Sequence, residues 1–177
     1  MYMDLVLEIL KYTLPALVVA LVVYVMLKTY FDNNYKLKVL DLKSKNSKEY
    51  LPLKLQAYER LTLFVHRTSP ENLIPRNTLP NQTAKQLKKL LLQSIQQEFE
   101  HNITQQVYVS NNVWNAIVAY KAQLIKTINI IDQKLGDGKT AYDLSKIILE
   151  EYHNNEELLT AAQVNDIIKA EIKHLFI

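Results

Sequence analysis

Hydrophobic residues follow two patterns along this chain: an uninterrupted run near the N-terminus and a periodic pattern from residue 51 onward. Residues 12–27 read YTLPALVVALVVYVML, 16 residues without a charged side chain. At ~1.5 Å per residue, a helix of that length covers about 24 Å, and its extension to Phe31 covers about 30 Å, the thickness of a hydrocarbon core. Because the stretch is apolar on every side of a helix, it predicts a transmembrane helix and not the amphipathic helix of a soluble core.

The ends of this stretch carry residues that suit a membrane interface. Aromatic side chains stand near both ends, as in the aromatic belts of membrane proteins. Lys28 is the only charged residue between residues 12 and 31, and its long stem can reach the lipid headgroups. Pro15 falls in the first turn, where a kink is least costly. The residues expected in the span are Tyr12, Leu14, Pro15, Leu17, Leu21, Tyr24, Leu27, Tyr30 and Phe31.

Residues 1–11, MYMDLVLEILK, precede the span. Their charged positions, Asp4, Glu8 and Lys11, form one polar stripe, which predicts an amphipathic lead-in continuous with the span. A cleaved signal peptide is disfavoured, because such a peptide begins with basic residues and ends at a small-residue cleavage site. We therefore treat residues 1–31 as lead-in and membrane anchor.

The net charge of +3 lies just after the anchor. Residues 49–177 contain 14 basic and 14 acidic side chains, whereas residues 28–48 contain six lysines and two aspartates. Positive charge on this side predicts a periplasmic N-terminus and a cytoplasmic C-terminal domain at a bacterial inner membrane. These lysines are expected to contact anionic lipid headgroups, and each contact would stabilise membrane binding by roughly 1 kcal/mol. Alternatively, they remain solvated and only set the orientation of the span. They are Lys28, Lys36, Lys38, Lys43, Lys45 and Lys48.

Residues 32–50 form a basic connector whose structure the pattern leaves open. The segment KLKVLDLK alternates partly like a strand, but the connector lacks turn signals apart from Asn33 and Asn34. We therefore expect a helical extension of the anchor.

From residue 51 onward the apolar positions recur with helical period. A helix is predicted to begin at Pro52. A second is opened by a capping box of Thr83 and Gln86 and has apolar residues at four-residue steps: Leu87, Leu91, Ile95 and Phe99. A long helix from Trp114 ends before Gly136, and helices over 142–152 and 164–175 follow, the last opened by a capping box of Thr160 and Gln163. Residues 75–82 are expected to be a loop and residues 102–112 an extended crossing. The pattern thus predicts an all-α protein, with residues 51–177 as a cytoplasmic bundle of five helices.

The search for chemistry finds no catalytic, cofactor or metal site in the sequence. LGDGKT at 135–140 resembles a phosphate-binding loop, but Gln133 stands where that motif needs glycine, and a helix precedes it. The four histidines form no H-x-x-x-H pair, and the chain has no cysteine. Nucleic-acid binding is disfavoured because residues 49–177 are neutral. An enzyme or metalloprotein with a site assembled from distant helices remains a minor alternative.

Two blocks carry a family resemblance: LPLKLQAYERLTLFVHRTSPENLIPR at 51–76 and FEHNITQQVYVSNNVWNAI at 99–117. They resemble an uncharacterised family of small single-pass membrane-anchored helical proteins of Bacteroidota. The resemblance covers nearly the whole chain and implies the same layout, one N-terminal span and a cytoplasmic helical domain. It implies no activity, cofactor or catalytic residue.

These observations lead to a non-enzymatic accessory or scaffold protein of the bacterial inner membrane. We expect its helical domain to bind a protein partner, in a membrane-protein complex or a homo-oligomer, and its anchor to contact membrane lipid. The alternative is a lipid or envelope-stress sensor that uses the lysine-rich connector. The sequence leaves open the identity of the partner and the cellular process.

Overall fold

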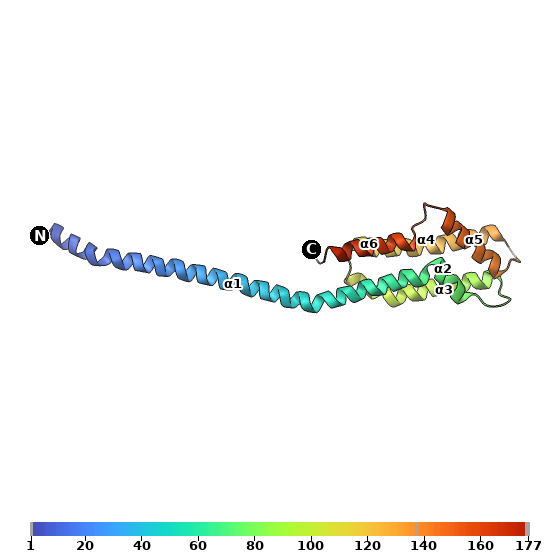
Figure 1. Cartoon of the computed structure of the whole chain (residues 1–177), viewed down its shortest axis with the longest axis horizontal. Coiled ribbons are helices and arrows are strands. Elements are labelled where there is room, and N and C mark those ends of the chain that lie inside the picture. The colour runs from blue at the N-terminus through green and yellow to red at the C-terminus, as the bar shows by residue number, and fades with distance from the viewer. Residues whose placement is uncertain (1, 137, 176–177) are drawn as a thin grey trace. The chain divides into compact units, whose positions relative to one another are not determined.

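The structure is a computed structural model that describes residues 2–136 and 138–175, except for the side chains of residues 4–9 and 42–49. The described residues form helices and no strands, which confirms the all-α prediction (Figure 1). The elements are α1 (Tyr2–Thr68), α2 (Pro70–Asn77), α3 (Ala84–Asn102), the 3-10 helix η1 (Ile103–Val107), α4 (Asn111–Leu135), α5 (Ala141–Asn154) and α6 (Ala161–Lys173).

The chain divides into two units, residues 1–50 and residues 51–177. In the first unit, the part of α1 from Leu10 to Asp41 is long and apolar enough to cross a membrane, and none of its most apolar window is buried within the protein. The connector of residues 32–50 belongs to the same helix, so the expected helical extension is confirmed.

The helix that was predicted to begin at Pro52 does not begin there. Pro52 lies inside α1, which continues to Thr68. A proline in a helix interior removes one hydrogen bond and destabilises the helix by about 3 kcal/mol. The sequence therefore favoured Pro52 as the first residue of a new helix. The prediction was wrong because no glycine stands before residue 52 and nothing else there ends the helix.

The core of the second unit forms where the amphipathic faces of its helices meet. The helix α3 packs against α2, α4 and α5, and α4 packs also against α5 and α6. Leu87, Leu91 and Ile95, at the predicted four-residue steps of α3, are fully buried. The α1 segment of this unit contributes Leu61 and Phe64 to the same cluster. Burial of each such side chain stabilises the unit by about 1.5–3 kcal/mol.

Helix caps hold the ends of these helices. The two predicted capping boxes, at Thr83 and Thr160, are confirmed, and Thr140 forms a third with Asp143. The starts of α3 and α5 are joined, because the Ala84 amide donates to the Lys139 carbonyl at 3.0 Å and the Ala141 amide donates to the Gln82 carbonyl at 2.9 Å. Amides that a helix start leaves without partners are thereby satisfied.

Of two predicted irregular segments, the first is mainly a loop as expected and the second is mainly helical. The helix α2 runs through Pro75 to Asn77, so the loop predicted over 75–82 begins only at residue 78. The extended crossing predicted over 102–112 is wrong, because α3 tightens into η1 and α4 begins at Asn111, capped by Ser110. Its β-branched residues suit a strand locally, but no strand lies among the described residues to pair with it. The end of α4 at Leu135, with Gly136 at a φ of 75°, is as predicted.

Candidate functional site

A groove of about 500 Å³ lies between the second-unit part of α1, α2 and α3. Its walls are mainly polar. All three arginines of the chain, Arg60, Arg67 and Arg76, line it, although the chain has 21 basic residues. Arg60 and Arg67 are seven residues apart on α1, so they share one side of that helix. Three of the positive charges of this unit are therefore gathered on one surface.

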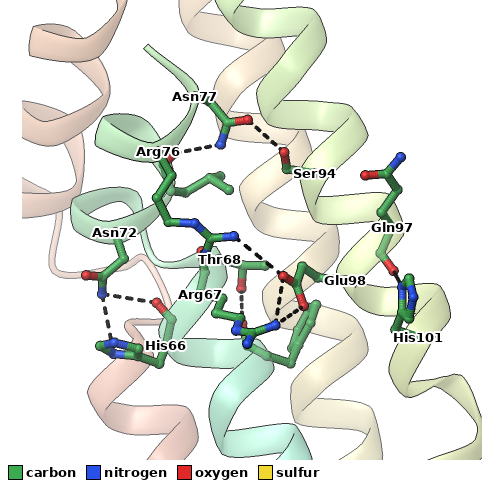
Figure 2. A network of polar contacts seen from close by, with 12 residues as sticks. His66, Arg67, Thr68, Asn72, Arg76, Asn77, Ser94, Gln97, Glu98 and His101 are labelled. Carbon is green, nitrogen blue, oxygen red and sulfur yellow. Dashed lines mark hydrogen bonds and ion pairs between the residues drawn. The ribbon is translucent and has the colours of Figure 1, made fainter.

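Glu98 lines this groove and is paired with two of the arginines. Its Oε1 atom lies 3.3 Å from Arg67 Nη1 and 3.6 Å from Arg76 Nη2. Figure 2 shows the two guanidinium groups, one from α1 and one from α2, converging on this carboxylate of α3. The Glu98 side chain is 18% exposed and each arginine side chain is 50% exposed. Ion pairs this accessible to water contribute about 0–1 kcal/mol each, so the cluster is not primarily a stabilising device.

Hydrogen bonds between neighbouring elements fix the rim of the groove. Arg76 Nη1 donates to the Arg67 carbonyl at 3.4 Å, which ties α2 to the end of α1. Ser94 donates to Asn77 Oδ1 at 2.8 Å, and Asn77 Nδ2 donates to the Leu73 carbonyl at 2.7 Å (Figure 2). The position of Arg76 opposite Arg67 is therefore set by several contacts and not by the ion pair alone.

An aromatic row lies behind the groove. Phe64, which lines the groove and is buried, makes an edge-to-face contact with Phe99, with ring centroids 6.1 Å apart. Phe99 in turn lies 5.6 Å from the Trp114 ring, and Lys121 Nζ stands 3.9 Å from the Phe99 centroid. Such pairs contribute about 0.5–1.5 kcal/mol beyond their buried area. The row links the groove to the start of α4.

A second polar cluster joins the last helix to the rest of the unit. The Glu171 carboxylate of α6 accepts hydrogen bonds from the Tyr58 hydroxyl, the Ser110 hydroxyl and, at 3.0 Å, the Ser110 amide. Partial burial raises the pKa of this carboxyl, but the bonds from Ser110 and Tyr58 outweigh that effect and hold the pKa below its ordinary value of 4.5. This cluster connects three segments and is structural.

The sequence-predicted span residues lie along α1 in the first unit and do not converge on a site. Exposed fractions are 55% for Leu14, 66% for Leu17, 60% for Leu21, 51% for Leu27 and 64% for Phe31. The predicted tyrosines of the span and Pro15 are exposed as well: Tyr12, Tyr24 and Tyr30. Apolar side chains so widely exposed need a cover that this chain does not supply.

The predicted lysines of the flank are described only in part. Lys28, Lys36 and Lys38 are exposed on α1. The side chains of Lys43, Lys45 and Lys48 lie outside the described residues.

Sequence reasoning missed the groove. Its residues form no catalytic or ligand-binding motif. One signal was available: three arginines against eighteen lysines, with Arg60 and Arg67 on one side of a helix. Glu98 could not be paired with them from the sequence, because it lies 31 positions after Arg67.

Other candidate chemistry does not form a site among the described residues. No group of three metal-ligating side chains is found there. The LGDGKT segment ends α4 at Gly136 and turns into the cap of α5, as expected for a helix end and not a phosphate loop. Asp137 lies outside the described residues.

The chain belongs to a family of unknown function, DUF7935, whose model matches residues 4–175. The resemblance to an uncharacterised family is thereby confirmed. No curated protein and no solved structure matches the chain.

Proposed function

We propose that this member of the family is a membrane-anchored protein without catalytic activity, which binds a protein partner through its helical domain. The observation that carries the proposal is the groove between α1, α2 and α3, which is open, mainly polar and lined by exposed arginines. Arginine is enriched at protein interfaces, where its planar group forms paired hydrogen bonds. An enclosed apolar cavity with a few converging polar groups would instead be typical of a small-molecule site.

The anchor supports the other half of the proposal. Within the helix Leu10–Asp41, residues 12–27 carry no charge and are exposed, and a lipid bilayer is the cover that suits such an apolar surface. We place the protein in a bacterial inner membrane, with its N-terminus in the periplasm and residues 51–177 in the cytoplasm. The lysines after the apolar stretch support that orientation.

Site-specific photo-crosslinking in native cells tests partner binding. A photoreactive residue replaces Gln97 in the groove or, as control, Lys146, which is exposed on α5 and does not line the groove. The expected result is a discrete adduct from position 97 that position 146 does not give. An adduct of twice the chain mass would identify the partner as a second copy. Equal adduct patterns at both positions, or none, would contradict the proposal.

Contact with anionic lipid is a second candidate role, favoured by the exposure of Lys28, Lys36 and Lys38 on α1. Each lysine near an anionic surface contributes about 1 kcal/mol. The full chain should then be more stable to heat in nanodiscs of anionic lipid than in zwitterionic ones, and K28Q/K36Q/K38Q should lose the difference. Equal stability of the unsubstituted chain in both lipids would remove this role.

A further inference from the structure

The arginine groove has unused capacity for a negatively charged ligand. Each guanidinium carries five N–H donors in a plane, which matches the two oxygens of a carboxylate. Arg67 and Arg76 share the single carboxylate of Glu98 at 3.3–3.6 Å, longer than the ~2.7–2.9 Å of well-formed charge-assisted bonds. Arg60 lines the groove and has no ion pair among the described residues. Most of the donors therefore remain available.

The charge of the groove matches one carboxylate better than a phosphate. Three arginines face two acidic side chains, Glu59 and Glu98, which leaves one positive charge in excess among these five groups. A phosphate group carries close to two negative charges at neutral pH, whereas a carboxylate carries one.

The remaining lining favours a peptide over an isolated anion. The side-chain amides of Gln56 and Gln97 and the Ser94 hydroxyl can donate and accept hydrogen bonds. A peptide backbone offers both donors and acceptors, whereas a fully ionised phosphate monoester or the phosphodiester of a lipid headgroup only accepts. Leu63, 44% exposed at the same groove, supplies an apolar contact beside the arginines.

We propose that this groove binds an acidic peptide segment of a partner protein, whose carboxylate replaces Glu98 between Arg67 and Arg76. Glu98 holds the two guanidinium groups in position when the groove is empty and competes with the ligand when it arrives. This inference rests on the proposed function and names the chemistry of the partner.

The test is selection from a displayed random peptide library on the full chain in mild detergent. Selected peptides should be enriched in Asp and Glu next to apolar residues. Affinity for one of them, measured by fluorescence polarisation, should fall about tenfold in R67Q/R76Q. The matched control K146Q/K169Q removes the same charge from exposed sites outside the groove and should bind like the unsubstituted chain.

The variant E98Q separates competition from a structural role. If Glu98 competes with the ligand, E98Q should bind the peptide about two- to fivefold more tightly, the size of an exposed ion pair. A weaker or unchanged affinity of E98Q would show that Glu98 does not compete with the peptide. Circular dichroism and thermal unfolding of each variant check that the fold is retained.

Several results would overturn the inference. These are a library without binders, selected peptides without acidic enrichment, and equal affinities of R67Q/R76Q and K146Q/K169Q. Competition by inorganic phosphate or by short-chain phosphatidylglycerol at the peptide's own concentrations would identify a general anion or lipid site instead. If the photo-crosslink from position 97 persists in R67Q/R76Q, the proposed function stands and this inference fails.

Discussion

Two carboxylates of the helical domain, Glu98 and Glu171, differ in what they contact. Glu98 is shared between two exposed arginines at the groove, whereas Glu171 accepts three hydrogen bonds that join α6 to α1 and to the start of α4. Hydrogen bonds to a charged group contribute about 1.5–3 kcal/mol, more than an exposed ion pair. Substitutions at the two positions should therefore affect different properties, binding at Glu98 and stability at Glu171.

We expect E171Q to lower the free energy of unfolding by about 1–2 kcal/mol at neutral pH, because the amide keeps one acceptor and loses the charge. The pKa of Glu171 is lowered in the folded chain, so its contribution is present above the ordinary value of 4.5 and is lost as pH falls through the lower folded value. The loss of unfolding free energy in E171Q should thus become smaller below the folded-state pKa of Glu171. Urea unfolding of the full chain in detergent at pH 7 and at pH 3 measures it.

The matched control is E150Q, which removes a carboxylate that is 56% exposed and paired only with Lys146 at 3.8 Å. It should change stability by less than about 0.5 kcal/mol. An E171Q deficit that is the same at both pH values would show that the hydrogen bonds, and not the charge, are responsible.

The helices themselves were largely predictable, and their ends were predictable where a specific residue defines them. Thr83 with Gln86, Thr160 with Gln163 and Gly136 each form the cap that their residue types favour. Prediction failed at Pro52 and across residues 102–112. In both places a local preference, for a helix start or for extended chain, was overridden by the continuation of a neighbouring helix.

The paired starts of α3 and α5 should behave as one unit. T83A and T140A each remove an N-cap and should cost about 1 kcal/mol. Because the residues beside each cap exchange backbone bonds, the double variant should depart from additivity by at least about 0.5 kcal/mol. Thermal or urea unfolding of the four members of this double-mutant cycle measures the coupling.

The comparison cycle pairs T83A with T160A. Thr160 caps α6, and no backbone bond joins that start to α3. The two costs should therefore add within about 0.5 kcal/mol. A coupling of equal size in both cycles would show that the bridge between α3 and α5 is not its cause.

At the scale of the whole molecule, the sequence predicted the long apolar helix and the helical domain better than it predicted the candidate site. Uninterrupted apolar residues and flanking lysines are local signals, so an anchor and its orientation can be predicted from the sequence alone. The groove depends on three elements that meet only after folding. No local pattern connects Arg76 of α2 with Glu98 of α3, because their contact is made by packing and not by spacing.

The absence of cysteine makes the orientation directly measurable. Single cysteines are introduced at Met3 and at Glu157, both exposed, and are treated with a membrane-impermeant maleimide. We expect M3C to react in intact cells and E157C to react only after lysis. Reaction of E157C in intact cells would reverse the proposed topology. Replacement of the six flanking lysines by glutamine should give a mixture of both orientations.

The aromatic row behind the groove has an optical consequence. Trp114 is the only tryptophan in the chain, and Phe99 links its ring to Phe64 at the groove wall. A segment that enters the groove and displaces water there changes the surroundings of this row. We therefore expect the emission of Trp114 to change when the groove is occupied, which can be read in the unlabelled protein without interference from any other indole.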